Sequence, residues 1–436
     1  MRDIALTLVF VGLILYSFRQ HFVGPLIWAW FSLMNPHRLT FGFAYTMPFA
    51  QIAAVTVLLA LLVSRTRQPF PRTSTTALLV LFYLWTCITS LASFNEPGAV
   101  YDMWIKVTKI QLMIFATLVM IHGRKQLDLL IWVIVLSLGF YGFKGGIFTI
   151  SHGGNSMVMG PPGTFIEGTN HLAMAMLMVV PLMYYLATQN SNQWVRRGLY
   201  LLMLLTTLSV LGTTSRGALL GIVVMAVLLA LKSQRRLLML TVIGVVTIGV
   251  LATMSEQWAD KMGTITTHED DSAQSRLYTW KMIWNLVLQH PITGGGFQIT
   301  ENVATWNTYA VTEWSKAYSP HSIYFQVLAE HGFVGFALYL GLGISTWRRC
   351  NSLIRRCNTD ETRWAAVLAR MSQVSIAGFA AGGAFVNLAN FDLPYYIVAL
   401  IILADVAVTE TLKKAKSARP ESGPAQPIAA TPGIGV

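Results

Sequence analysis

The chain has 436 residues, of which 54% are apolar and only 11% are charged. Because soluble domains carry roughly a quarter charged residues, this composition excludes an ordinary soluble enzyme. Lysine and arginine number 31 against 19 acidic residues, which gives a formal net charge of +12. On so apolar a chain this basic excess indicates membrane orientation and anionic partners rather than nucleic acid. The three cysteines are too few for a disulfide framework, and no spacing suits zinc.

Apolar runs separated by short polar breaks predict an all-α polytopic membrane protein with about 12 transmembrane helices. The runs cover residues 4–34, 45–63, 74–92, 103–121, 126–149, 171–187, 199–213, 217–231, 236–254, 321–346, 364–387 and 391–411. We interpret the first run as a single crossing broken at Gly24-Pro25, because each half is too short to span alone. No small-residue cleavage site follows it, so we expect this segment to remain as a membrane anchor.

The runs divide the chain into nine predicted helices within residues 1–254, a large outer loop at 255–320, three helices within 321–411 and a disordered tail at 412–436. An even number of crossings puts both termini on one side, where the loops hold twenty basic residues against eight on the other side. The positive-inside rule therefore predicts cytoplasmic termini. The eight outer residues are Arg38, Lys106, Lys109, Arg216, Lys261, Arg276, Lys281 and Lys316.

The outer loop at 255–320 is the only long one, and loops beyond about 15 residues are usually functional. Residues 275–288 within it have helical spacing, with Ser272 or Ser275 available as the N-cap. The apolar face of this predicted helix consists of Leu277, Trp280, Trp284 and Leu288. We expect the helix to lie along the membrane surface.

Two arginines at the outer boundary are candidates for binding an anion. Arg216 occupies a very short turn between two apolar runs, and Arg276 opens the predicted loop helix, where the helix dipole disfavours a cation unless an anion compensates. A guanidinium offers a planar fork of donors that matches phosphate oxygens. The two could clamp a pyrophosphate; alternatively, Arg216 extends to lipid headgroups and Arg276 is an ordinary surface arginine.

His321 follows Pro320, and Ser319-Pro320 predicts the N-cap and first position of the helix that leaves the loop. The positive end of that helix dipole disfavours imidazolium, so the side chain should be neutral near pH 7 and able to accept a proton. Beside a bound pyrophosphate it could act as a general base on a hydroxyl, with Tyr324 one turn further on. The alternative is an ordinary interfacial histidine.

Several other polar residues are secondary candidates. At the start of the crossing at 171–187, Glu167, Asn170 and His171 could bind sugar hydroxyls or cap the helix. Within an apolar run, Glu330 and His331 could be a functional pair or a buried structural pair. The last outer turn holds Asn387, Asn390 and Asp392, and Lys281 follows Arg276 on another side of the predicted loop helix. Glu269-Asp270-Asp271 is interpreted as a solvated turn rather than a metal site. No metal motif, nucleotide-binding glycine loop or Gly-x-Ser-x-Gly elbow is found, so we expect no cofactor.

Four short motifs on this frame resemble a known family. They are Ser215-Arg216-Gly217-Ala218, Ser275-Arg276 with Tyr278 and Trp280, Pro320-His321-Ser322-Ile323-Tyr324 and Glu330-His331-Gly332-Phe333-Val334-Gly335. In this order they resemble the O-antigen ligase and polymerase superfamily over roughly residues 160–400. The opening segment, through Asn35-Pro36-His37-Arg38, is similar to the O-glycosylation ligases associated with exosortase systems.

The resemblance implies a metal-independent, inverting glycosyltransferase at the periplasmic face of a bacterial inner membrane, and it makes 255–320 a periplasmic loop. The donor would be a glycan on undecaprenyl pyrophosphate, and a ligase would transfer it to lipid A–core in lipopolysaccharide biosynthesis. Arg216 and Arg276 would bind the pyrophosphate, and His321 would deprotonate or orient the acceptor hydroxyl. This chain has His321-Ser322 where many relatives have His-Asn.

We therefore predict an O-antigen ligase. The alternatives are an O-antigen or exopolysaccharide polymerase, a protein O-oligosaccharyltransferase and, from a different class, a transporter of polyprenyl-linked glycans. A transporter would need cations near the bilayer midplane, where Lys144 and Arg370 are the only well-placed basic residues.

Overall fold

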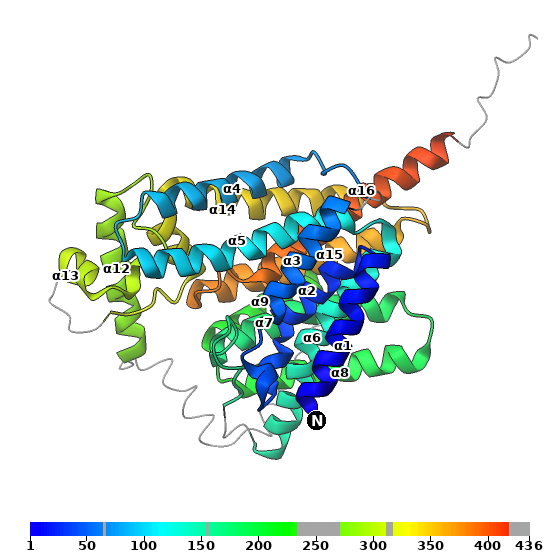
Figure 1. Ribbon diagram of the computed structural model, residues 1–436, viewed down its shortest axis with the longest axis horizontal. Helices are drawn as coiled ribbons and strands as arrows, with labels where there is room; N and C mark the ends of the chain where they lie inside the picture. Colours follow the sequence, from blue (N-terminus) through cyan, green and yellow to red (C-terminus); the bar gives the residue numbers. More distant parts are fainter. Residues whose placement is uncertain (64–66, 154–156, 233–270, 311–316, 418–436) are drawn as a thin grey trace, which may run out of the picture.

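The computed structural model describes residues 1–63, 67–153, 157–232, 271–310 and 317–417 (Figure 1). Within these ranges the chain is helical and contains no strand, as the sequence predicts. The helices are α1 (Arg2–Arg19), α2 (Val23–Met34), α3 (Phe49–Val63), α4 (Ser74–Leu91), α5 (Pro97–Met120), α6 (Gly123–Ser151), α7 (Thr169–Gln189), α8 (Gln193–Gly212), α9 (Arg216–Lys232), α12 (Asp271–Gln289), α13 (Val303–Tyr309), α14 (Ile323–Arg356), α15 (Arg363–Gly382) and α16 (Asp392–Ser417). Short 3-10 helices lie at Pro36–Leu39 (η1), Phe43–Tyr45 (η2), Ile299–Glu301 (η3) and Gly383–Phe385 (η4).

Among the described helices, 8 are long and apolar enough to cross a membrane, which supports a multi-pass membrane protein. They are α4, α5, α6, α7, α8, α14, α15 and α16. The apolar helices α2, α3 and α9 are shorter. The run predicted at 236–254 lies outside the described residues, so the number of twelve crossings stays a prediction. Helix α16 continues through residues 412–417, which we had expected to belong to a disordered tail.

The interpretation of residues 4–34 as one broken crossing is wrong. The chain forms two helices, α1 and α2, which pack against each other through Phe10 and Phe31. The carboxylate of Asp3 accepts hydrogen bonds from the backbone N–H groups of Gly42 and Ala44, so the start of α1 lies beside the segment that follows α2. The two helices therefore form a hairpin that turns at residues 20–22, whereas Gly24-Pro25, where the sequence analysis placed the break, lies inside α2. The common side of the two termini stays a prediction.

Helix α7 lies at the centre of the bundle. Almost every side chain from Leu172 to Ala187 is buried, and α6, α8, α9 and α15 all contact this helix. A helix that is apolar on all sides is stable only when neighbours cover every face, and its many alanine and methionine side chains let those neighbours approach closely. The first turn of α7 is thereby fixed at the end of the bundle where the loop at 157–168 enters.

Close packing between α9 and α15 depends on glycines spaced four residues apart on both helices. An added Cβ at Gly217 would lie 3.1 Å from the carbonyl oxygen of Gly382, and one at Gly221 would lie 3.1 Å from that of Gly378. Small residues at this spacing let two helix backbones touch in a membrane, where van der Waals contact rather than water exclusion holds helices together. The seam positions the first turn of α9, which carries Arg216, against α15 and η4.

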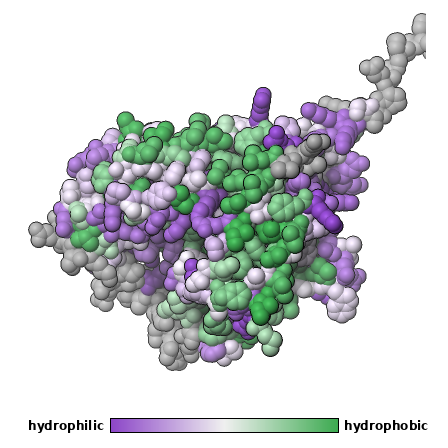
Figure 2. Space-filling model, viewed as in Figure 1, coloured by the Kyte–Doolittle hydropathy of each residue, from purple (hydrophilic) through white to green (hydrophobic). Residues whose placement is uncertain are grey.

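The surface separates into apolar and polar zones (Figure 2). Apolar residues cover much of the middle of the molecule in this view, and hydrophilic residues gather at the end that contains α12 and α13 and again near the end of α16. Exposed apolar side chains such as Leu81, Leu136, Leu204 and Val223 come from four different helices. This distribution is the one expected of a bundle whose middle faces hydrocarbon.

Replacing Gly382 by alanine should destabilise the bundle, because the new Cβ would lie 2.8 Å from the backbone oxygen of Gly217 and one of the helices must shift. Such overpacking costs about 1–3 kcal/mol. The matched control is Gly198→Ala on α8, where an added Cβ meets no atom within 4 Å. Thermal unfolding of the detergent-purified variants should show a lowered midpoint for Gly382→Ala only. Equal midpoints would contradict a packing role for the seam.

Candidate active site

The helix predicted in the outer loop exists as α12, but its boundaries and buried face differ from the prediction. It begins at Asp271, so Ser275 lies inside it and Arg276 lies in its second turn. The dipole argument for Arg276 is therefore wrong, because that effect is confined to the first turn. Leu277, Trp284 and Leu288 are exposed, and the helix packs through Met282, Ile283, Leu286 and Val287 instead. That this helix lies along the membrane surface stays a prediction.

Trp280 connects α12 to the chain just before α14. Its indole Nε1 donates to the carbonyl of Pro320 at 2.8 Å, and its ring stacks on Phe325 with centroids 4.9 Å apart. Arg276 precedes Trp280 by one helical turn, so the same contacts hold Arg276 beside His321. The sequence quoted Trp280 only as part of a motif; its structural role is to bring the two candidates together.

His321 lies outside α14 rather than in its first turn. The helix is capped by Ser322, whose hydroxyl accepts from the N–H of Phe325, so the predicted cap at Ser319-Pro320 is wrong. His321 adopts a φ of 44°, in the left-handed region that is unfavourable for residues other than glycine. Strained backbone of this kind is held only by its surroundings and clusters at functional sites.

The pKa of His321 is lowered from 6.5 to about 4, first by burial and then by the nearby charges of Arg276 and His171. The imidazole is therefore neutral at pH 7, as expected, although the causes are burial and neighbouring groups rather than a helix dipole. Its Nδ1 atom is buried and accepts or donates no hydrogen bond among the described residues. A neutral imidazole with a free nitrogen can accept a proton from a bound hydroxyl.

Arg216, which the sequence analysis placed in the turn, is the first residue of α9 and is partly buried. The preceding Ser215 caps this helix, because its hydroxyl accepts from the N–H of Ala218 at 3.3 Å. Thr214 has a φ of 55°, which turns the chain sharply between α8 and α9. The short helix η4 contacts both α9 and α14, and Gly383 in it packs on Ile323. Arg216 and His321 therefore lie at the same end of the bundle.

Helix α14 is interrupted at Gly332, which has φ 65° and ψ −170°. The N–H groups of Gly295 and Gly296 donate to the carbonyls of Ala329 and Glu330 at 2.8 and 3.0 Å, replacing the helical bonds that the break removes. Trp85 Nε1 donates to the carbonyl of His331 at 3.0 Å. The glycine run at 294–296 thus satisfies the backbone of a broken membrane helix, and irregular backbone is tolerated in a membrane only when protein groups satisfy it in this way.

A polar cavity of about 470 Å³ opens beside this break, and we call it the polar cavity. It joins the loop at 157–168 to η3 and to the first half of α14. Its lining residues are Met103, Met159, Thr164, Phe165, Glu167, Gly168, His171, Gln298, Thr300, Glu301, Pro320, Gln326, Glu330 and Asn387. Pro320 precedes His321, and His171 lies close enough to affect the pKa of His321, so His321 stands at the edge of this cavity.

Glu330 and His331 have different roles. His331 is fully buried and its Nδ1 is bonded to Thr89 of α4 at 2.7 Å, which makes it structural. Glu330 lines the polar cavity, where its carboxylate accepts from Asn390 at 3.2 Å and from Gln326 and the N–H of Gln298 at 3.4 Å. The break at Gly332 and the loop that docks on it therefore hold a carboxylate at the cavity wall.

The other secondary candidates separate into two groups. His171 and Asn387 line the polar cavity and are bonded to each other at 3.0 Å, and Glu167 lines it while accepting from the N–H of Gly163 at 2.8 Å. The remaining candidates do not line the cavity: Asn170 lies on the first turn of α7, Lys281 is exposed on α12, Tyr324 donates to the carbonyl of Ala380, and Asp392 is buried where α16 begins.

Sequence reasoning missed Gln298, Thr300, Glu301 and Gln326, which complete the wall of the polar cavity. A second polar cavity, of about 410 Å³, shares Gln298 and Glu301 with it and continues to Asn95 and Asn302. Burial raises the pKa of Glu301, and Lys106 opposes this shift. In the sequence, the one feature that could have predicted these lining residues is the high proportion of polar side chains between Gln298 and Asn302. Among the described residues, no group of three histidine, cysteine or acidic side chains could hold a metal ion.

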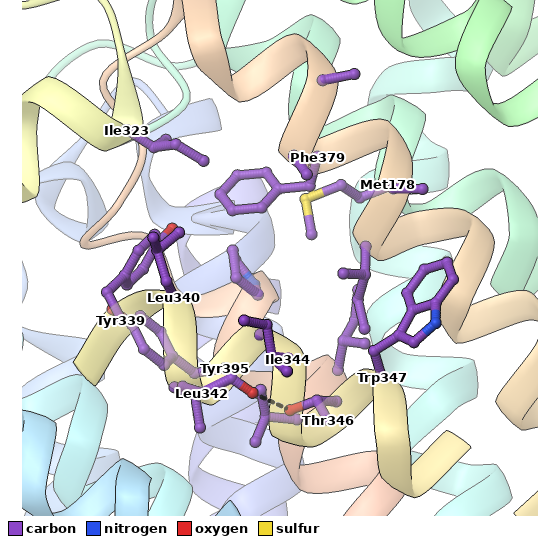
Figure 3. A pocket seen from close by; sticks show the side chains of 18 of the residues that line it. Met178, Ile323, Tyr339, Leu340, Leu342, Ile344, Thr346, Trp347, Phe379 and Tyr395 are labelled. Carbon is purple, nitrogen blue, oxygen red and sulfur yellow. Dashed lines mark hydrogen bonds between the residues drawn. The ribbon is translucent and has the colours of Figure 1, made fainter. Parts of the chain in front are cut away.

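An apolar groove of about 750 Å³ begins just after His321 in the chain, at Ile323 and Tyr324. It runs between α14, α15 and α16 and reaches Trp347 and Arg348. Figure 3 shows Ile323 and Phe379 toward one end of the groove and Thr346 and Trp347 toward the other, with Tyr395 and Ile344 between them. Along the chain, His321 thus lies between Pro320, which lines the polar cavity, and Ile323, which lines the apolar groove.

Two protein families match parts of the chain. Residues 201–340 match a family described as O-antigen ligase, and residues 1–191 match a family of unknown function (DUF5935). No curated protein matches the chain. The first match includes Arg216, Arg276, His321 and Glu330, and it supports a place in the O-antigen ligase and polymerase superfamily. Members of that family are glycosyltransferase-like ligases and polymerases, which indicates an enzyme. The similarity to exosortase-associated ligases stays a prediction.

The lowered pKa of His321 should make the folded protein less stable in acid. Between pH 6.5 and about 4 the unfolded chain binds a proton at this residue and the folded chain does not, so stability falls as the pH falls. His321→Asn removes this titration. Its melting midpoint, measured from pH 8 to pH 4, should therefore fall less than that of the wild type. Parallel curves for the two proteins would contradict a buried neutral imidazole.

Proposed function

We propose that this protein is an O-antigen ligase. It transfers a glycan from undecaprenyl pyrophosphate to a hydroxyl of lipid A–core at the periplasmic face of the bacterial inner membrane, with inversion at the anomeric carbon and without a metal ion. The family match to residues 201–340 supports the superfamily, and the arrangement around His321 supports the reaction.

The observation that carries this proposal is that His321, close enough to Arg276 and His171 for both to lower its pKa, lies in the chain between Pro320, which lines the polar cavity, and Ile323, which lines the apolar groove. A polyprenyl-linked glycan has the same order of properties along its length: an apolar chain, a dianionic linkage and a polar sugar. The groove fits the apolar chain, the polar cavity fits sugar hydroxyls, and Arg276 with Arg216 provides cations at the junction. No single one of these features would distinguish such a donor from an ordinary lipid.

The residues can supply the chemistry of glycosyl transfer. The acceptor hydroxyl attacks the anomeric carbon, the bond to the pyrophosphate oxygen breaks, and the electron pair leaves with that oxygen. Arg216 and Arg276 stabilise the charge that develops there, because their guanidinium groups stay ionised at any working pH. His321, whose imidazole is neutral at pH 7, accepts the proton of the attacking hydroxyl.

The polar cavity and its neighbour offer a continuous surface for a sugar chain. Glu167, Glu301 and Glu330 provide carboxylate acceptors, and Gln298, Asn387 and His171 provide groups that donate or accept. Sugar hydroxyls need such short, mixed contacts, and two connected cavities can hold several sugar units. The carboxylates also disfavour acidic sugars in this part of the site.

The transporter alternative is less well supported. Lys144 and Arg370 are both exposed on the surface of the bundle and line neither the polar cavity nor the apolar groove. Cations that guided an anionic glycan through the membrane would face an interior pathway. A polymerase or a protein O-oligosaccharyltransferase would use the same donor chemistry and differs only in the acceptor, so the product decides among the three.

The purified protein, incubated with an undecaprenyl-pyrophosphate glycan, lipid A–core and excess EDTA, should form capped core, because two arginines can supply the charge stabilisation that a divalent ion gives in other glycosyltransferases. Mass spectrometry of the lipid products distinguishes the outcomes. A longer polyprenyl-linked glycan would identify a polymerase. Loss of transfer that magnesium restores would contradict the metal-independent mechanism.

Replacing Arg216 or Arg276 by alanine should lower the rate of transfer about a hundredfold or more, as removal of a preorganised charge-stabilising donor does in other enzymes. Lys281→Ala is the matched control, since it removes one positive charge from the exposed side of α12, away from the polar cavity. The amount of folded protein should be the same in all three variants. Wild-type rates in both arginine variants would end the proposal of a pyrophosphate clamp.

A further inference from the structure

A third cavity lies at the C-terminal end of α14, the end opposite His321. It has a volume of about 630 Å³ and is enclosed by α4, α14 and α16. Three arginines line it, Arg348, Arg349 and Arg356, together with a single acidic residue, Asp405. By the count of basic loop residues, this end belongs to the cytoplasmic face. We call this space the arginine cavity.

Asp405 fixes two of the three arginines. Its two carboxylate oxygens are paired with Arg349 and Arg356, one oxygen to each guanidinium. Arg349 also donates through Nε to the hydroxyl of Thr75 on α4 at 3.0 Å, and its side chain is only 14% exposed. One carboxylate therefore holds two guanidinium groups in a fixed orientation, an arrangement preorganised for anions.

Positive charge remains after this pairing. The lining holds three arginines and one aspartate, a net charge of +2. Arg348 is exposed and makes no ion pair or hydrogen bond with any residue in the described ranges. An anion placed between Arg348 and the pair on Asp405 would meet cations on two sides, with the hydroxyls of Ser345 and Ser352 as further donors.

The remaining wall of the arginine cavity is apolar. Leu78 and Ile344 line it, and Ile344 is 53% exposed. Leu81, one turn further along α4, is 50% exposed on the same helix. A ligand with only an anionic group would leave this wall uncovered, whereas an amphiphile would cover the apolar surface and neutralise the arginines together.

We propose that the arginine cavity binds an anionic phospholipid of the bilayer, with its phosphodiester between Arg348 and the Arg349–Arg356 pair and its acyl chains on Leu78 and Ile344. Such a lipid would join α4, α14 and α16 at the end of the bundle away from the polar cavity. It shares Ile344 and Arg348 with the far end of the apolar groove, but lipid binding is measured without a glycan donor, so the result does not depend on the proposed transfer reaction. Charge complementarity selects an anionic over a zwitterionic headgroup, and the apolar wall selects a lipid over free phosphate.

Native mass spectrometry of the detergent-purified, full-length protein tests this proposal. Titration with phosphatidylglycerol should give one saturable adduct, whereas phosphatidylcholine should bind more weakly and inorganic phosphate should neither bind nor compete. Arg348→Gln should weaken phosphatidylglycerol binding about fivefold, the effect of one basic residue near an anionic lipid. Because Arg348 is exposed and holds no other residue, this variant should keep the wild-type melting midpoint.

Two further variants complete the test. Arg196→Gln removes one charge from an exposed position at the start of α8, outside the arginine cavity, and should bind phosphatidylglycerol as the wild type does. Leu78→Trp, at a position that lines the arginine cavity and not the apolar groove, should weaken binding without any change of charge, because the larger side chain fills the apolar wall. Equal affinity for the two lipids, equal losses in Arg348→Gln and Arg196→Gln, or competition by inorganic phosphate would each overturn the proposal.

Discussion

The interruption of α14 at Gly332 is the constraint on which the site depends. A membrane helix can be broken only where other protein groups satisfy the freed backbone atoms, and the loop at 291–296 does so with two N–H donors and with the carbonyl of Pro291, which accepts from Phe333. No side chain fits at Gly332, because an added Cβ would lie 2.3 Å from the carbonyl oxygen of Ile292. The outer loop and the membrane helix are therefore one structural unit, and the polar cavity exists because they meet.

Next to that unit, residues 321–331 include both side chains that face the polar cavity and side chains that are buried in packing. Glu330 is held at the cavity wall by three neutral donors, while His331 beside it is buried against Thr89 and serves packing. His321 adopts an unfavourable backbone conformation between Pro320, which lines the polar cavity, and Ile323, which lines the apolar groove. Strain, buried polar groups and an irregular helix all cost stability, and their concentration at one end of the bundle is the physical sign of a site.

Much of the fold follows from hydrophobic runs, since a segment that must satisfy its own backbone in hydrocarbon has to be helical. The runs anticipate the existence of α3 to α9 and of α14 to α16, but not all of their bounds: α14 continues to Arg356, ten residues beyond the predicted run, which ends at 346. They fail at residues 4–34, because length alone does not distinguish a broken crossing from a hairpin, which depends on contacts such as that of Asp3 with Gly42. Helical spacing also misassigns the buried face of α12, which packs through Met282, Ile283, Leu286 and Val287 and leaves Leu277 and Trp284 exposed.

The site was predictable in its charged residues and not in its walls, and the reason is chemical. A cation in an apolar chain is conspicuous, whereas Gln298, Thr300 and Gln326 resemble any polar residue until the fold brings them together. Even among cations, position in the sequence does not reveal the role of a residue. Arg349 is neutralised by Asp405, which lies 56 residues further along the chain. The charge of Arg276, by contrast, helps to lower the pKa of His321, and Trp280 one turn further along α12 holds the two residues close to each other. Charge counting finds the arginines; only their neighbours decide whether each one orients the chain, holds another residue or meets a ligand.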